Sequence, residues 1–230
     1  SLREACWILE QADSRGYAVN KSYATLAEFP GDTTPFAKAL GFGQRSSLTD
    51  NGGKSEFFPG AYTESVDMPF ADCGSLVKPE PGVIFWHHWP DHRLHNHDDP
   101  GKGLSSLSKE VESHLTGDDF WTLVDRLAHG RRLIITSDHG YAASGLFPDS
   151  DKKQNEYLKK IYKSGRWSNK QKEAGAWAPP IDLAIQSVHG HHLYMNGRRK
   201  WKSAGGYPTL THGGLTVLEV AVPFIEISRS

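Results

Sequence analysis

Carboxylate and imidazole side chains follow two apolar segments that have the pattern of buried β-strands. Residues 83–86 lead to Asp91 and His95, and residues 133–136 lead to Asp138 and His139. In an open α/β sheet, ligands bind beyond the carboxyl ends of the strands. A mixture of carboxylate and imidazole suits Zn²⁺ or Mn²⁺, whereas an all-oxygen set would suit Mg²⁺ or Ca²⁺. The sequence therefore predicts a transition-metal site at this edge of the sheet.

A further histidine, His212, lies in a glycine-flanked turn late in the chain. Together these groups exceed the needs of one cation, which favours two adjacent metal ions. Each motif also has a purely structural interpretation. Asp-His-Gly is a common turn in which the Asp side chain accepts hydrogen bonds from backbone amides. The histidine-rich loop over residues 87–97 could be an exposed segment without a function.

The elements that must position these residues alternate between helical and strand patterns. Ala5, Ile8, Leu9 and Ala12 recur at helical spacing, which predicts a helix over residues 2–15 that ends at Gly16. Further along, the patterns predict a strand at 17–19, a loop at 28–35, irregular structure over 44–80, helices over 104–129 with a break near Gly117, a hairpin over 192–202, a helix at 215–221 and a strand at 223–227. Either Thr33 or Thr34 is expected to be the N-cap of a helix with Pro35 at its first position. The alternation predicts an α/β fold with a mostly parallel sheet and helices on both faces.

Composition excludes several classes of protein. The chain has 230 residues with 26 Lys and Arg against 27 Asp and Glu, so no overall basic field favours nucleic acid. Apolar runs stay far below the roughly 20 residues that a membrane span requires. Cys6 and Cys73 could form at most one disulfide, which excludes a disulfide framework. We expect a cytoplasmic protein with no membrane partner.

Two basic segments could contact a nucleic-acid backbone locally. Residues 152–172 contain eight basic residues and a single acid, with Tyr157, Tyr162 and Trp167 between them. Interleaved cations and aromatic rings can follow phosphates and stack on bases. A second run comprises Arg198, Arg199, Lys200 and Lys202. The alternative for the first segment is a solvated helix face.

The order of these motifs resembles the alkaline phosphatase superfamily. Asp91-x-x-x-His95, then Asp138-His139-Gly140, then a late His212 is the order of that superfamily's metal ligands. Within it, the chain looks most like the PglZ domain. Residues 211–223 resemble that domain's His-Gly-Gly-x-Ser/Thr-x-x-Glu-Val-x-x-Pro motif, residues 134–141 its Asp-His-Gly strand, and residues 29–33 its Pro-x-x-Thr turn.

The resemblance implies an alkaline-phosphatase-like architecture for the chain. This is a three-layer αβα sandwich with a mostly parallel central sheet, formed as a single domain over residues 1–230 with an insertion or cap at 150–205. Ser1-Leu2-Arg3-Glu4 is similar to the segment that follows the first strand and its metal-binding Asp in PglZ-type chains. The resemblance thus implies a chain cut from a longer protein, without that first strand.

The resemblance also implies roles for individual residues. Asp91, His95 and His212 would hold one cation, with His97 or Asp98 as substitutes for His95. Asp138, His139 and the Asp of the preceding strand would hold the other. Thr33 would be both ligand and nucleophile, with Thr34 as its rival. The predicted substrate-binding residues are Arg3, Arg198 and Arg199.

The activity implied is a metal-dependent phosphodiesterase that acts on nucleotide or oligonucleotide phosphodiesters. Its cofactors would be two divalent metal ions, with Zn²⁺ favoured and Mn²⁺ as the alternative. Its other partners would be proteins of prokaryotic phage defence such as BREX systems. Two alternatives remain: another reaction of the superfamily (phosphomonoesterase, phosphomutase or sulfatase), or a non-catalytic scaffold in a defence complex.

Overall fold

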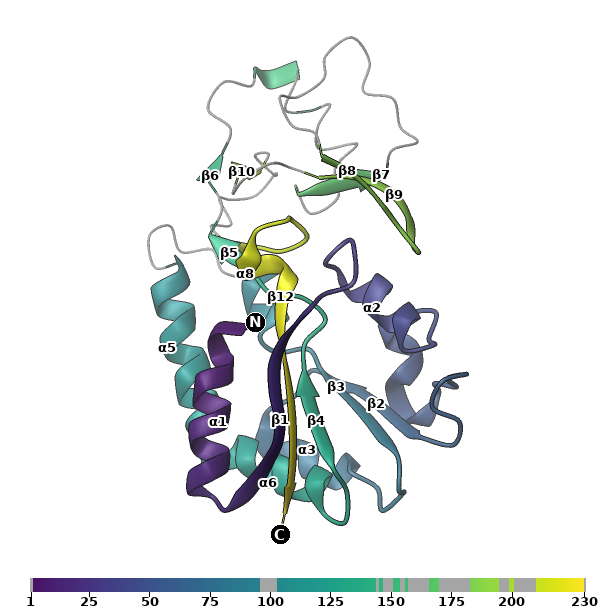
Figure 1. Ribbon diagram of the computed structural model, residues 1–230, viewed down its shortest axis with the longest axis vertical. Helices are drawn as coiled ribbons and strands as arrows, with labels where there is room; N and C mark the ends of the chain where they lie inside the picture. The colour runs from purple at the N-terminus through teal and green to yellow at the C-terminus, as the bar shows by residue number, and fades with distance from the viewer. Residues whose placement is uncertain are drawn as a thin grey trace.

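Short helices and strands alternate along the chain in the computed structural model (Figure 1). It describes residues 2–95, 103–143, 145–146, 151–153, 156, 166–169, 183–194, 199–200 and 210–229. The helices are α1 (Ala5–Ser14), α2 (Thr33–Ala39), α3 (Phe70–Cys73), α4 (Asp91–His95), α5 (Gly103–Thr116), α6 (Asp118–Ala128) and α8 (Val217–Val220), with 3₁₀ turns η1 (Leu2–Glu4), η2 (Arg45–Asn51) and η3 (Gly74–Leu76). The strands are β1 (Tyr17–Leu26), β2 (Tyr62–Val66), β3 (Val83–His87), β4 (Leu133–Thr136), β5 (Ala142–Ala143), β6 (Gly145–Leu146), β7 (Trp167–Asn169), β8 (Leu183–Ser187), β9 (Gly190–Tyr194), β10 (Arg199–Lys200), β11 (Leu210–Thr211) and β12 (Ala221–Arg229).

The sheet below the predicted site is antiparallel, in the order β1-β12-β4. Tyr23 of β1 pairs with Phe224 of β12, and Ile225 of β12 pairs with Ile135 of β4. The prediction of a mostly parallel central sheet is therefore wrong for the described residues. The reason is that α8 delivers the chain to β12 at the end of the sheet where β1 and β4 finish. A parallel strand would need a crossover of about a dozen residues back to the opposite end.

Strands β2 and β3 form a separate parallel pair that is covered on both faces. Ile84 and Trp86 of β3 pack against the cluster around α2 and η2. Phe85, on the opposite face, packs against the cluster around α3 and α6. Strand β2 falls within residues 44–80, which were expected to be irregular. That prediction was wrong because Tyr62–Val66 alternates weakly and is recognisable as a strand only beside β3.

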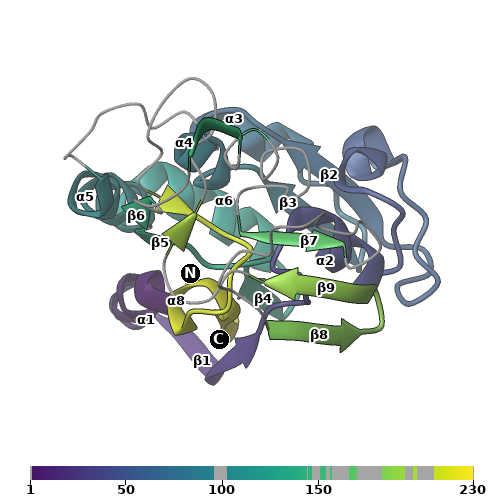
Figure 2. The same cartoon turned by 90° about the horizontal axis from the view of Figure 1, so that it is seen from above.

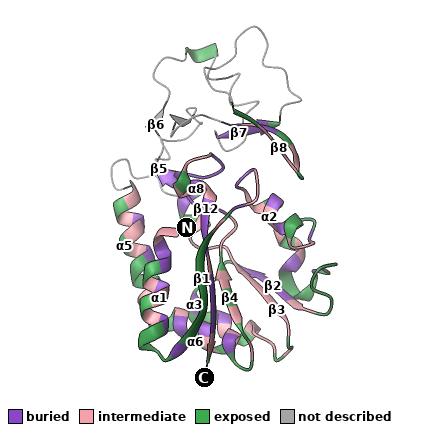
Figure 3. Ribbon diagram, viewed as in Figure 1, coloured by how far each residue is buried: buried purple, intermediate pink, exposed green. Residues whose placement is uncertain are grey.

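Helices α1, α5 and α6 cover one face of the β1-β12-β4 sheet. Their apolar residues form the main core with Ile225 and Ile227 of β12, which are both fully buried. On the other face, Tyr23 stacks on Phe224 and is 51% exposed, and Ile134 is 49% exposed. Most of β1 is exposed (Figure 3). Within the described ranges this sheet thus has one helical layer, and the predicted three-layer sandwich does not extend across it.

The apolar strands β3 and β4 are less buried than their sequences predict. Every residue of β3 is partly exposed, and β4 alternates between half-buried and exposed residues. Each has a single ladder partner in the described residues, β2 for β3 and β12 for β4, so each is the edge of its sheet. The unbroken apolar runs were correctly read as strands, but an edge position leaves one side open.

A small accessory sheet, β7-β9-β8, lies apart from the main sheet, beyond the end at which α2 and α8 are found (Figures 1 and 2). The hairpin predicted over residues 192–202 does not form, because β9 pairs with β7 and β8 while β10 pairs with β6. Residues 195–198, between β9 and β10, lie outside the described residues, as does most of the basic segment 152–172.

Two features bear on the chain's environment. No helix among the described residues has the length and apolar character to cross a membrane. Cys6 is exposed and Cys73 is buried, and both are free thiols.

A bidentate ion pair fixes helix α4, which carries Asp91, to helix α5. Arg93 donates to Glu110 through Nε at 2.9 Å and Nη2 at 3.1 Å. Burial alone would raise the pKa of Glu110, but the hydrogen bonds and charge of Arg93 outweigh it, so this pKa is lowered. A lowered carboxyl pKa stabilises the fold above the unfolded-state value of about 4.3, and that contribution is lost as the pH falls through the folded-state pKa.

We therefore expect Glu110→Gln to lower the free energy of unfolding by less than about 1 kcal/mol at pH 7, since the pair is partly solvated. At pH 3 the variant and the parent should differ much less. Urea unfolding at both pH values measures this, with the exposed Glu112→Gln on the same helix as the control. An equal loss at pH 3 and pH 7 would contradict an electrostatic origin.

Candidate metal centre

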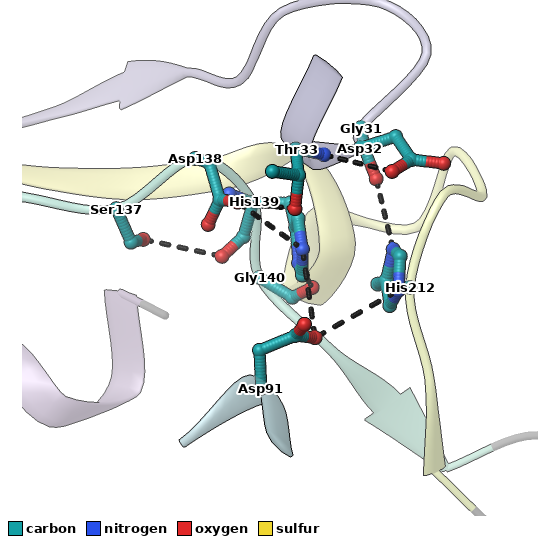
Figure 4. Close-up of polar contacts among 9 residues, drawn as sticks. All are labelled: Gly31, Asp32, Thr33, Asp91, Ser137, Asp138, His139, Gly140 and His212. Atoms are coloured by element: carbon teal, nitrogen blue, oxygen red, sulfur yellow. Dashed lines mark hydrogen bonds and ion pairs between the residues drawn. The ribbon is translucent and has the colours of Figure 1, made fainter. Parts of the chain in front are cut away.

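Loops from distant parts of the sequence meet at one end of the body (Figure 4). Asp91 is the first residue of α4, which follows β3. His139 follows β4, and His212 lies between β11 and α8. Thr33 is the first residue of α2, which follows β1. The segments that follow β1, β3 and β4 therefore bring Thr33, Asp91 and His139 to the same end of the fold.

Asp91, His139 and His212 form a compact group in which one ligand atom of each residue lies within 4.8 Å of the others. Asp91 Oδ1 lies 3.7 Å from His139 Nε2 and 3.8 Å from His212 Nε2. The two imidazole rings stack, with their centroids 3.9 Å apart. Both histidines are buried, and Asp91 is partly exposed. These separations are too long for direct hydrogen bonds and leave room for a shared cation.

Backbone carbonyls orient both imidazoles. His139 Nδ1 lies 3.0 Å from the carbonyl oxygen of Gly140, and His212 Nδ1 lies 3.1 Å from that of Gly31. A carbonyl oxygen can only accept, so each Nδ1 must carry the proton. In the neutral ring, Nε2 then presents a lone pair toward Asp91. This second contact fixes the tautomer that a metal-binding histidine requires.

The electrostatics favour a neutral imidazole at His212. Burial, and after it the neighbouring His139, lower the pKa of His212 below its ordinary value. Two stacked rings of this kind cannot both be protonated without mutual repulsion. Neutral imidazole is also the form that binds a metal ion.

A buried nitrogen in the group also supports binding of a divalent transition metal. His139 Nε2 is buried, and among the described residues it has no hydrogen-bond partner. An unsatisfied buried acceptor is costly, and native proteins rarely leave one without a partner. A cation between His139 Nε2 and the Asp91 carboxylate would satisfy it, and mixed imidazole and carboxylate donors suit Zn²⁺ or Mn²⁺.

Thr33 lies beside this group through Asp138. Its Oγ1 donates to Asp138 Oδ2 at 3.1 Å, while Asp138 Oδ1 accepts from the His139 backbone N–H at 3.1 Å. The N-cap of α2 is Asp32, whose carboxylate accepts from the Thr33 N–H at 2.8 Å, so the prediction of a threonine N-cap was wrong. Because the better acceptor caps the helix, the Thr33 hydroxyl remains available to Asp138. Thr34 is exposed.

The described ligands are grouped differently from the two sets that the family resemblance implies. His139, expected with Asp138, faces Asp91 and His212. Asp138 is nevertheless close, since its Oδ2 lies 3.6 Å from His139 Nε2. The carboxylates and imidazoles therefore form one continuous cluster.

Of the remaining predicted site residues, only Arg3 has a described side chain. The side chains of His95 and Arg199, and the whole of His97, Asp98 and Arg198, lie outside the described residues. Arg3 is described, and its guanidinium lies 5.9 Å from the centre of the Tyr141 ring. Tyr141 follows the Asp138-His139-Gly140 loop and donates a 2.5 Å hydrogen bond to Glu4.

Sequence reasoning missed Gly31 and Asp32. The Gly31 carbonyl orients His212, and a Cβ at Gly31 would lie 3.6 Å from His139 Cβ and 3.7 Å from Gly213 Cα. Asp32 was visible as an acceptor just before a helix start, a sufficient signal for an N-cap. The role of Gly31 had no signal, because it depends on contact with a residue far along the chain.

Comparisons with known proteins give limited likenesses. No protein-family model matches the sequence, and no curated protein matches it. Among solved structures, murine ectonucleotide pyrophosphatase/phosphodiesterase 5 is similar, with 15% identity, a TM-score of 0.48, and coverage of 79% of this chain and 58% of that chain. The inactive form of the same protein in complex with AMP is similar with 15% identity, a TM-score of 0.44, and coverage of 70% and 52%. The chain therefore spans less than two thirds of the length of these solved structures.

We expect the chelator-treated protein to bind Zn²⁺, and we expect His212→Ala to weaken that affinity by about 10-fold or more, since a lost ligand should cost at least as much as a lost outer-shell partner. Calorimetric titration with Zn²⁺ measures this. The exposed His129→Ala is the control for adventitious binding to surface histidines. Equal affinities in all of these proteins would exclude this cluster as the binding site.

Proposed function

We propose that this chain provides the catalytic site of a metal-dependent phosphohydrolase that cleaves phosphodiesters. The observation that carries the proposal is the placement of a threonine hydroxyl beside a cluster of carboxylates and imidazoles. Thr33 Oγ1 contacts Asp138, Asp138 contacts His139, and His139 faces Asp91 and His212. A nucleophile, a group that holds its proton, and a cation site are the parts that phosphoryl transfer requires.

Asp91, His139 and His212 would hold one divalent cation. Asp138 and Thr33 would contribute ligand atoms to a second. Bound there, such cations supply positive charge that polarises a phosphoryl oxygen and lowers the pKa of a nearby hydroxyl. The mixed donors support Zn²⁺, with Mn²⁺ as the alternative.

The chain's own residues account for the remaining steps. Asp138 accepts the hydrogen bond of Thr33 and so orients a lone pair of Oγ1 away from itself, toward a substrate phosphorus. The Thr33 hydroxyl gives its proton to Asp138, which passes it to solvent. Attack by Oγ1 forms an Oγ1–P bond and breaks the ester P–O bond, and the departing alkoxide takes a proton from solvent. Water then cleaves the phosphothreonine, which restores Thr33 and releases the phosphate product.

The substrate class rests on the resemblance of residues 134–141 and 211–223 to the PglZ domain. That resemblance supports nucleotide or oligonucleotide phosphodiesters as substrates, proteins of phage-defence systems as partners, and a cytoplasmic location. Within the basic segment 152–172, Arg166 and Trp167 are buried, so contacts to the substrate backbone would have to come from its other basic and aromatic residues. Monoester or sulfate-ester hydrolysis and a non-catalytic scaffold are the outcomes that a substrate panel would reveal.

We expect Thr33→Ala to lower kcat for bis(p-nitrophenyl) phosphate by a factor on the order of 10³ or more, as removal of a nucleophile does in other hydrolases. Thr34→Ala should retain most of the activity, because Thr34 is exposed and lies outside the contact with Asp138. Thr33→Ser, which keeps a hydroxyl, should retain part of it. Steady-state kinetics with added Zn²⁺ or Mn²⁺ measure all three.

A covalent intermediate gives a second readout. Acid-quenched reactions analysed by mass spectrometry should show phosphate on the peptide that contains Thr33. Full activity in both Thr33→Ala and Thr34→Ala would rule out the mechanism. A metal-loaded protein that hydrolyses none of the diester, monoester and sulfate model substrates would support the scaffold role.

A further inference from the structure

A fully buried ion pair lies immediately behind the candidate metal centre. The side chains of Arg166 and Glu219 are both 0% exposed. Arg166 donates to Glu219 twice, from Nε to Oε1 at 2.9 Å and from Nη2 to Oε2 at 2.7 Å. Neither residue belongs to the ligand cluster, and the proposed mechanism uses neither.

The Glu219 carboxylate also fixes the turn that contains His212. Its Oε1 accepts from the Gly214 N–H at 3.0 Å, and its Oε2 accepts from the Thr216 hydroxyl at 2.7 Å and the Thr216 N–H at 3.3 Å. This is a capping box at the start of α8. The turn is tightly enclosed, because a Cβ at Gly214 would lie 2.1 Å from Arg166 Nη2. The path of the backbone beyond His212 is therefore set by this carboxylate.

The backbone of Glu219 fixes the loop of the other histidine. Its carbonyl oxygen accepts from the Gly140 N–H at 2.8 Å. The carbonyl of Gly140 in turn is the group that orients His139 Nδ1. One residue thus holds both imidazole-bearing loops, His212 through its side chain and His139 through its main chain.

The pair also connects the centre to the accessory sheet. Arg166 directly precedes β7. The same sheet contacts the loop before Thr33, where Ser187 Oγ donates to the Phe29 carbonyl at 2.8 Å. The accessory sheet therefore holds the loops on two sides of the ligand cluster.

A buried ion pair is weak evidence for stability, because desolvation offsets most of its attraction and a well-packed apolar pair often stabilises as well. What such a pair adds is a defined geometry, since bidentate guanidinium–carboxylate contacts tolerate little rotation. The geometry that it defines here is that of the two histidine loops.

We propose that Glu219, held in place by Arg166, is the positioning residue of the metal centre. It keeps His139 and His212 at the separation from Asp91 that binds a divalent cation. This inference rests on the proposed function, since it assumes that the cluster binds metal.

The test replaces the pair with an apolar one, Arg166→Met together with Glu219→Met, and titrates Zn²⁺ into the chelator-treated full chain by calorimetry. We expect the Zn²⁺ affinity to fall by about 10- to 100-fold, as for the loss of groups that orient ligands. No charge is left buried without its partner. The unfolding midpoint should still fall, because Gly214 and Thr216 lose their acceptor, so Zn²⁺ affinity is compared at a temperature where near-ultraviolet circular dichroism shows the double variant folded. Glu219→Gln and Arg166→Lys, measured while near-ultraviolet circular dichroism shows them folded, are the second set and should also bind Zn²⁺ more weakly.

Glu226→Gln is the matched control. Glu226 is also buried and lies on β12, but it pairs with Lys21 and Arg132 rather than with the histidine loops. It should lower the unfolding midpoint without changing the Zn²⁺ affinity by more than about twofold. If the parent binds Zn²⁺ and the folded pair variants bind it equally well, the positioning role is wrong and the proposed function stands. If the parent binds no Zn²⁺, the metal centre and this inference both fail.

Discussion

The arrangement of the site depends on how two buried imidazoles are held in a fixed orientation. Each Nδ1 is committed to a backbone carbonyl, that of Gly140 for His139 and that of Gly31 for His212. Each ring is thereby left with Nε2 facing Asp91, and one of these nitrogens is buried without a partner in the part of the chain that the structure describes. A buried acceptor that lacks a donor is expensive. The loops around it therefore have to be held firmly enough to maintain a geometry that only a ligand satisfies.

The fold maintains that geometry by bringing backbone into close contact. The glycines of the three loops make this approach feasible, since a Cβ at Gly31 would contact the loops of both histidines and one at Gly214 would collide with Arg166. Strand β12 and helix α8 supply the rigid base, because β12 is central to its sheet and Glu219 of α8 contacts both histidine loops. Stability and site geometry are thus coupled through one short stretch of chain.

Local patterns predicted much of this structure. The helix over 2–15, the break at Gly117 and the strand at 133–136 were correctly placed, because periodicity and helix-terminating residues act over a few positions. The direction of β12 was wrongly predicted, because whether a strand runs parallel depends on where the chain enters the sheet. The N-cap of α2 was placed one residue too late, because Asp32 precedes the threonines and Asp is a stronger N-cap residue than Thr; its carboxylate accepts from the Thr33 N–H.

The sequence by itself determined which residue types are present and that polar, metal-competent groups follow apolar strands. Only the tertiary structure decided that His139 joins Asp91 and His212, that Thr33 rather than Thr34 meets Asp138, and that Glu219 lies behind both histidines. The physical reason is the sequence separation between the residues that make contact. Propensity and spacing report on neighbours in the chain, whereas these contacts join loops that are distant in sequence and meet only when the sheets and helices have packed.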